Sequence, residues 1–298
     1  MKILITGIAG FIGSNLAERL VKDGHEVLGY DNFLSGLPDN VKNLNIEMVE
    51  KIDDLKVDKI FHLGMPSSSP MYREDRFKII EAVEITLKVL ELAKKLNVHI
   101  VYATTSSIYN GNEPPYKEDM KVHITDFYTE ARYFIERLFD LYDKFYGITS
   151  VGLRFFSVYG PNDQGKGKYA NTVTQFALDM INGKEPVLYG DGSQERDFIH
   201  VEDVVEALIK ASEHKKTDIF NTGTGKAYSF NDLIGAINKA LGTEIKPKYI
   251  ENPFKAYLSC TLADTTKAEN VLGFKSKYEF EEGIKKQVEY LKKINNEV

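Results

Sequence analysis

The sequence lacks the features that define several large classes of protein. Its single cysteine, Cys260, excludes an internal disulfide and is typical of a reducing cytosol. No stretch approaches the ~20 apolar residues of a membrane-spanning helix. Acidic residues outnumber basic ones, 44 to 38, which argues against a protein that binds the phosphate backbone of nucleic acids. We therefore expect a cytoplasmic protein with no nucleic-acid or membrane partner.

What the sequence does contain is a regular alternation of apolar runs and amphipathic stretches. Its 298 residues, 43% of them apolar, suffice to bury a sizeable core. Longer stretches with apolar residues near helical spacing cover 74–96 and 127–146. Between and before them lie short apolar runs that are typical of buried strands, at 3–6, 27–31, 46–49, 59–63 and 99–103. This order predicts an α/β fold with a Rossmann-type, doubly wound parallel sheet.

The regular pattern loosens beyond about residue 160, where glycine-containing loops separate shorter elements. This change predicts two domains. We expect a dinucleotide-binding domain over 1–165 and a smaller C-terminal lobe over 166–298, with some of the later segments returning to the main sheet.

The turn after the first predicted strand is rich in glycine. Gly7, Gly10 and Gly13 allow a tight turn, a close approach of the backbone to a pyrophosphate, and close packing of the helix that follows. Asp31 ends the second strand, where a carboxylate can bind ribose hydroxyls but repels a 2′-phosphate. The alternative is a glycine turn that only packs. The position of the acid favours a site for NAD rather than NADP.

A second group of polar residues follows the fifth predicted strand. All residues of 104–109 except Ile108 carry a hydroxyl side chain, and they lie at the carboxyl edge of the sheet, where ligands bind in such folds. Tyr128 opens a predicted helix, and Arg132 lies one turn later on the same face. A tyrosine ordinarily has a pKa near 10, so its use as a base near neutrality requires a nearby cation. Taken alone, however, this Tyr–Arg spacing is more often a surface contact.

Several motifs together resemble one known family. The chain is similar to the extended short-chain dehydrogenases/reductases of the nucleotide-sugar epimerase and dehydratase group, especially their UDP-glucose 4-epimerase-like members. The motifs that carry the resemblance span nearly the whole chain, at 7–13, 61–63, 153–161, 190–204, 221–225, 263–264 and 272–274. The resemblance implies tightly bound NAD, a nucleotide-diphosphate sugar as substrate, Tyr128 as the proton-transfer residue and Thr105 as a hydroxyl that binds the sugar. Arg132 stands where the family has lysine, and it keeps the positive charge.

The resemblance also implies the residues of the two binding sites. Cofactor-binding positions are Gly7, Gly10, Phe11, Ile12, Gly13, Asp31, Asn32, Leu63, Tyr128, Arg132 and Phe155. Substrate-binding positions are Ser68, Thr105, Ser106, Ser157, Asn171, Arg196 and Thr261. For Ser68 an ordinary polar loop is an equal alternative, and Phe254 or Lys255 falls where the family usually has arginine. The small Thr261 leaves room for an N-acetylated sugar.

The residues after Thr105 indicate the reaction. Family dehydratases and decarboxylases carry an acidic residue just after this hydroxyl, whereas here Ser106 and Ser107 follow it. We therefore expect a 4-epimerase acting on UDP-glucose and UDP-galactose or their N-acetyl forms, through a transient 4-keto sugar with NAD regenerated in place. The alternatives are an NAD-dependent nucleotide-sugar oxidoreductase that releases its cofactor and a non-catalytic nucleotide-binding relative.

Two expectations concern other partners. The six histidines show no metal-ligand spacing with carboxylates or cysteine, so no metal is expected. His62, at the end of a strand, is more readily explained as a structural histidine than as a catalytic one. By its resemblance to the family, the chain is expected to form a homodimer through the helices over 74–96 and 127–146.

Overall fold

The computed structural model describes residues 1–252 and 258–296, and its centre is a parallel sheet. Within these residues the sheet has seven strands in the order β11-β6-β5-β4-β1-β2-β3. In chain order the strands are β1 (Lys2–Thr6), β2 (Glu26–Tyr30), β3 (Glu47–Met48), β4 (Lys59–His62), β5 (His99–Thr105), β6 (Ser150–Phe155) and β11 (Asp218–Thr222). All neighbouring pairs are parallel. The strand order reverses between β1 and β4, where a doubly wound sheet binds its ligand. The predicted fold class is confirmed.

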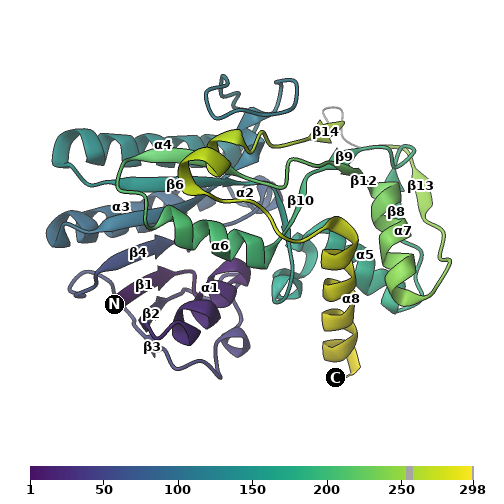
Figure 1. Ribbon diagram of the computed structural model, residues 1–298, viewed down its shortest axis with the longest axis horizontal. Coiled ribbons are helices and arrows are strands. Elements are labelled where there is room, and N and C mark those ends of the chain that lie inside the picture. Colours follow the sequence, from purple (N-terminus) through teal and green to yellow (C-terminus); the bar gives the residue numbers. More distant parts are fainter. Residues whose placement is uncertain (253–257, 297–298) are drawn as a thin grey trace.

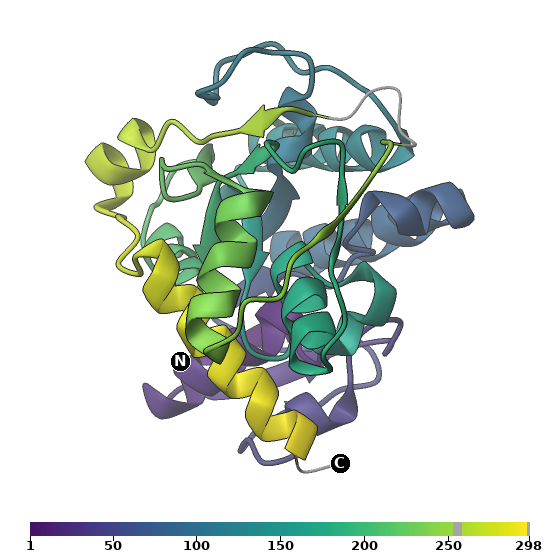
Figure 2. The same ribbon diagram turned by 90° about the vertical axis from the view of Figure 1, so that its right-hand side faces the viewer.

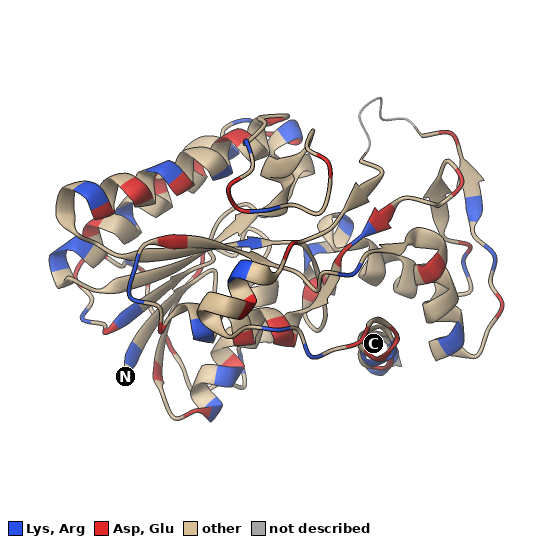
Figure 3. Cartoon of the chain, turned by 45° about the horizontal axis from the view of Figure 1, so that its top comes forward, with Lys and Arg blue, Asp and Glu red and all other residues tan. Residues whose placement is uncertain are grey.

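Helices cover both faces of this sheet (Figure 1). One face packs on α1 (Phe11–Lys22) and α6 (Val201–Ala211), and the other on α3 (Lys78–Leu96) and α4 (Phe127–Tyr146). The core strands are buried on both faces, as their unbroken apolar runs predict. Acidic and basic side chains are interspersed along the elements (Figure 3). Among the described residues, no helix combines the length and apolar character needed to cross a membrane.

A second group of elements packs around its own apolar core, made chiefly of three helices that lie side by side (Figure 2). The helices are α5 (Thr172–Ile181), α7 (Phe230–Leu241) and α8 (Phe280–Asn296). Small sheets accompany them, formed by β7 (Ser157–Tyr159) with β10 (Phe198–His200), by β8 (Val187–Tyr189) with β13 (Lys248–Ile250), and by β9 (Glu195–Arg196), β12 (Tyr228–Ser229) and β14 (Cys260–Thr261). Although β11 and α6 follow residue 166, they belong to the main sheet and its cover. The division at 165 stays a prediction.

Three predicted elements differ from the observed ones. The stretch predicted as one helix over 74–96 is helical only from Lys78, where α3 begins, and Glu74 instead ends the separate short helix α2 (Ser69–Glu74). Between them the Asp75 carboxylate accepts a hydrogen bond from the Phe77 amide, 2.9 Å away, and so competes with the helical pattern. The run over 46–49, expected to be a buried strand, yields only the two exposed residues of β3 at the sheet edge. Strand β5 continues through Thr105, so the first two hydroxyl residues end the strand rather than follow it.

Candidate active site

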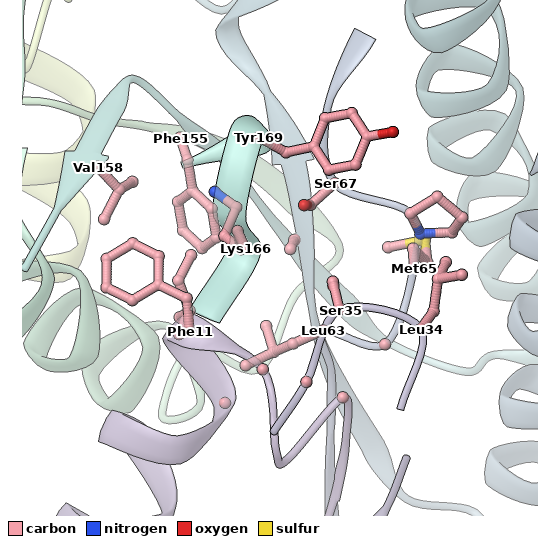
Figure 4. Close-up of a pocket in the computed structure, with 18 of the residues that line it drawn as sticks. Phe11, Leu34, Ser35, Leu63, Met65, Ser67, Phe155, Val158, Lys166 and Tyr169 are labelled. Atoms are coloured by element: carbon pink, nitrogen blue, oxygen red, sulfur yellow. The ribbon is translucent and has the colours of Figure 1, made fainter. Parts of the chain in front are cut away.

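A cavity opens at the carboxyl ends of β1, β4, β5 and β6, where the strand order reverses (Figure 4). Every residue predicted to bind the cofactor lines it, from the glycine turn and the end of β2 to Leu63, Tyr128, Arg132 and Phe155. Of the residues predicted to bind the substrate, Thr105, Ser157 and Asn171 line the same cavity. The fold therefore brings the predicted cofactor residues and three of the seven predicted substrate residues to one cavity, although the role of each residue stays a prediction.

The glycine turn is packed so tightly that Gly7 and Gly13 leave no room for a side chain. Gly7 has a φ of +73°, and a Cβ built there lies 2.6 Å from Cα of Gly64, the second residue after β4. A Cβ on Gly13 lies only 2.0 Å from the carbonyl oxygen of Gly7. The turn thus brings bare backbone and the first amides of α1 to the cavity wall. This cradle fits the diphosphate of a dinucleotide.

Asp31 connects the end of β2 to this turn. One carboxylate oxygen accepts a hydrogen bond from the Ala9 amide at 2.9 Å, and the other accepts one from the Phe33 amide at 2.7 Å. Burial raises the pKa of Asp31, while these backbone donors and that of Gly10 oppose the rise. A carboxylate has about four acceptor sites, so the two bonds leave capacity for ribose hydroxyls in the cavity.

Tyr128 is positioned by the first turn of α4. Asp126 caps this helix by accepting a hydrogen bond from the Thr129 amide at 2.8 Å, and the Thr129 hydroxyl accepts one in return from the Asp126 amide at 3.0 Å. The Ser69 hydroxyl donates to the Asp126 carboxylate and so ties α2 to the same cap. The Tyr128 ring, 8% exposed, packs on Tyr72 with ring centroids 5.5 Å apart. A capping box of this kind fixes the start of a helix, so the tyrosine is held at the cavity wall.

Arg132 provides a buried cation beside Tyr128. Its guanidinium carbon lies 5.3 Å from the centroid of the Tyr128 ring, and the residue is 4% exposed. The guanidinium donates to the carbonyl oxygens of Pro66, at 2.8 Å, and Ala103, at 3.3 Å, and also contacts the Met65 sulfur. Because these partners are neutral, they bind the guanidinium without cancelling its charge, and among the described residues its buried Nε has no hydrogen-bond partner. The arrangement suits stabilisation of an anionic phenolate.

His62 lies behind this site in a chain of hydrogen bonds. The Thr86 hydroxyl donates to the Ala82 carbonyl at 2.7 Å, so it accepts from Nε2 of His62 at 3.0 Å. Nδ1 therefore accepts from the Thr6 hydroxyl at 2.8 Å. Burial, with a contribution from the Arg132 charge, lowers the pKa of His62 to about 3. A fully buried, neutral imidazole with both nitrogens bonded fits the expected structural role.

Two buried histidines, His62 and His200, and the half-buried His99 predict that acid destabilises the fold. Burial lowers the pKa of His62 to about 3 and those of His99 and His200 to about 4. Above pH 6.5 these rings are neutral in both states, whereas below it only the unfolded chain takes up protons. Each ring then removes about 1.4 kcal/mol of unfolding free energy per pH unit, until the pH nears its folded pKa. Urea unfolding between pH 7.5 and 5 measures this slope.

A matched pair of variants identifies the source of that slope. His99→Gln is expected to make the unfolding free energy less dependent on pH, whereas Asn182→Gln, which changes no titratable group at an exposed position, leaves the dependence unchanged. An unfolding free energy that stays flat from pH 7.5 to 5 contradicts the buried, neutral assignment.

A buried polar network adjoins the cavity at Thr104. Glu136 of α4 holds Arg154 of β6 through two contacts, at 2.7 and 3.1 Å, and accepts a hydrogen bond from the Thr104 hydroxyl at 2.7 Å. Arg154 also donates to the Tyr109 hydroxyl, which donates in turn to Asn221 of β11 at 2.8 Å. The network joins the end of β5 to three other elements and fixes the strand that carries Thr105.

The other residues predicted to bind the substrate lie outside this cavity. Ser68, Ser106, Arg196 and Thr261 are not among the residues that line the cavity. Arg196 and Thr261 lie opposite each other on β9 and β14, so the fold does bring these two together. Asn171 caps α5, where its side-chain oxygen accepts from the Val173 amide at 2.9 Å. Phe254 and Lys255 are outside the described residues.

Some cavity residues were missed by the sequence patterns. Glu81 of α3, Lys166 and Tyr169 all line the cavity. Glu81 lies in an amphipathic helix, and Lys166 and Tyr169 lie in a short 3₁₀-helical segment, η3 (Asp163–Tyr169), that is rich in lysine and glycine. Neither motif nor periodicity therefore identifies them. Among residues 1–252 and 258–296, no group of three or more His, Cys, Asp or Glu side chains is arranged for a metal ion, and the absence of a metal stays a prediction.

The fold and cavity define a dinucleotide-binding protein of Rossmann type. Residues 3–223 match the model of the NAD-dependent epimerase/dehydratase family, to which the chain therefore belongs, and its cofactor is NAD. The predicted family and cofactor are confirmed.

Relatives and solved structures agree with this assignment. A putative UDP-glucose 4-epimerase of Methanocaldococcus jannaschii is 32% identical, covering 98% of this chain and 99% of its own. The UDP-glucose 4-epimerase of Thermotoga maritima, solved with UDP-glucose, has a TM-score of 0.93 and 32% identity over 99% of this chain and 100% of its own. A UDP-N-acetylglucosamine 4-epimerase of Methanobrevibacter ruminantium, in complex with UDP-N-acetylmuramic acid, has a TM-score of 0.92 and 28% identity over 99% of this chain and 98% of its own.

Proposed function

We propose that the protein is a cytoplasmic UDP-sugar 4-epimerase that retains its NAD. The observation that carries this proposal is the meeting of Thr105, Tyr128 and the uncompensated charge of Arg132 in the cavity that the glycine turn also lines. Serines rather than a carboxylate follow Thr105, which favours epimerisation over dehydration or decarboxylation. The 4-epimerases among its relatives support the same choice.

The side chains divide the chemistry between them. NAD, when bound, supplies a reversible two-electron oxidation at sugar carbon 4. The Tyr128 oxygen accepts the proton of the C4 hydroxyl, and the Thr105 hydroxyl forms a hydrogen bond to the same sugar oxygen. The 4-keto sugar then turns its other face to the cofactor, and Tyr128 returns the proton after carbon 4 is reduced. Because substrate and product have the same composition and oxidation state, the complete reaction consumes no external oxidant.

Product analysis tests this function. The purified protein is incubated with UDP-glucose, UDP-galactose, their N-acetyl forms and UDP-glucuronate, and the products are separated by chromatography and mass. We expect at least one pair to interconvert by inversion at carbon 4, with no change of mass and no accumulation of reduced cofactor. Stoichiometric reduction of added NAD indicates the oxidoreductase instead. Loss of water or carbon dioxide indicates a dehydratase or decarboxylase, and failure with every sugar favours a non-catalytic role.

We also propose that two copies pair through α3 and α4. Core residues such as Leu90 are fully buried, whereas other large apolar side chains of these two helices face outward. The exposed set comprises Ile80, Leu87, Phe127, Phe134, Leu141, Phe145 and Tyr146. An exposed apolar band of this kind marks an interaction surface. Sedimentation of the parent protein is expected to show a dimer. The double variant Phe134→Glu, Leu141→Glu is expected to sediment as a monomer, and an unchanged sedimentation coefficient contradicts this interface.

A further inference from the structure

Residues 161–169, here named the strap, cross the edge of the cavity. At its start, the Asn15 side chain donates to the Pro161 carbonyl and the Asn162 side chain donates to the Ser14 hydroxyl, both at 2.9 Å, which ties the strap to α1. At its end, the Tyr169 hydroxyl bonds to Glu74 of α2 at 2.5 Å. The strap is therefore held at both ends, from the helix after the glycine turn to the opposite wall.

The strap places Lys166 inside the cavity. Its side chain is 16% exposed and forms an ion pair, at 3.1 Å, with the fully buried Asp163. Its Nζ lies 5.6 Å from the ring centroid of Phe11, the first residue of α1. Figure 4 shows Lys166 on the same side of the cavity as Phe11 and Phe155. The ammonium group thus lies beside the side chain of the residue that begins α1, next to the glycine turn.

The cavity has few cations that could bind an anionic ligand, and Lys166 is one of them. Among its described lining residues the cations are Arg132 and Lys166, and Arg132 donates to carbonyl oxygens beside Tyr128. A dinucleotide diphosphate carries two negative charges, of which a helix terminus offsets only part. Lysine has three donors, and Asp163 occupies one of them. We propose that Lys166 donates to the diphosphate of the bound NAD and so holds the cofactor in place, whatever sugar the enzyme converts.

Binding measurements on cofactor-free protein test this role. We expect Lys166→Met to weaken the binding of NAD and of ADP about tenfold or more and to change the affinity for adenosine by less than twofold. The affinity for NAD should also become less dependent on salt concentration. Lys166→Arg, which keeps a cation, is expected to recover most of the affinity. Lys239→Met is the matched control, because it removes an ion-paired lysine from α7, outside the cavity, and is expected to bind NAD as the parent does.

Other outcomes overturn the proposal. A loss of UDP affinity with normal NAD and ADP affinity assigns the lysine to the substrate, and equal losses for adenosine and ADP indicate a structural effect. Because Lys166→Met leaves Asp163 without its ion pair, Lys166→Gln, which can still donate to Asp163, is measured beside it, with thermal melting as a test of folding. Unchanged NAD affinity in both variants also overturns the proposal. None of these readouts depends on which sugar reaction takes place.

Discussion

Replacement of Tyr128 by phenylalanine is expected to lower turnover by about 10²–10⁴-fold, the usual contribution of a positioned acid–base group. The change removes the one oxygen proposed to take and return the proton of the sugar, while the ring can still pack on Tyr72. NAD should therefore remain bound, and the melting temperature should stay close to that of the parent. Initial rates with the best sugar pair, together with the NAD content of the purified protein, give the result.

Tyr133 supplies the control for this experiment. It lies on the same helix but does not line the cavity, so Tyr133→Phe makes the same chemical change away from the site. Its turnover is expected to match that of the parent. If Tyr128→Phe turns over as fast as Tyr133→Phe, Tyr128 is not the proton-transfer residue.

Gly13→Ala is expected to abolish NAD binding at micromolar concentration. The added Cβ would lie 2.0 Å from the Gly7 carbonyl oxygen, which is backbone and cannot rotate away. The turn must open, and the amides at the start of α1 move from the position that receives a diphosphate. We also expect a loss of stability of about 1–3 kcal/mol from overpacking. Calorimetric titration with NAD and thermal melting measure the two effects separately.

Gly235 offers a glycine at which the same substitution is harmless. It lies within α7, and a Cβ built there has no other atom within 4 Å. Gly235→Ala should stabilise the protein by up to about 1 kcal/mol through helix propensity and leave NAD affinity unchanged. Parental NAD affinity in Gly13→Ala would show that the glycine turn does not hold the cofactor.

Four strands of the main sheet, β1, β2, β4 and β5, and one of its helices follow from local sequence signals. Helix α4 has the bounds expected from its periodicity, because Asp126 caps its start and Gly147 follows its end. The glycine turn and Asp31 likewise combine short-range motifs with a strand order that a doubly wound sheet imposes. Elements that rest on such local signals were therefore predicted from the sequence.

The rest depends on contacts between distant segments. The late start of α3 arises from a hydrogen bond of the Asp75 side chain, which the spacing of apolar residues does not indicate. Lys166 reaches the cavity because the strap is tied to Ser14 and Glu74, far from it in the sequence. Arg132 was singled out by its spacing from Tyr128, but its bonds to the carbonyls of Pro66 and Ala103 emerge only in three dimensions.

The buried network from Glu136 to Asn221 constrains any redesign of sugar preference. The Asn221 side chain also donates to the Tyr116 carbonyl at 2.8 Å and contacts that of Asp264 at 3.3 Å. A loop transplanted from a relative at residue 116 or 264 must place a carbonyl oxygen at the same position. Otherwise the Asn221 amide loses its acceptor, and the disturbance passes through Tyr109 and Arg154 to Glu136 and Thr104, the neighbour of Thr105. Laboratory evolution of this enzyme is thus best aimed at positions that leave those carbonyls in place.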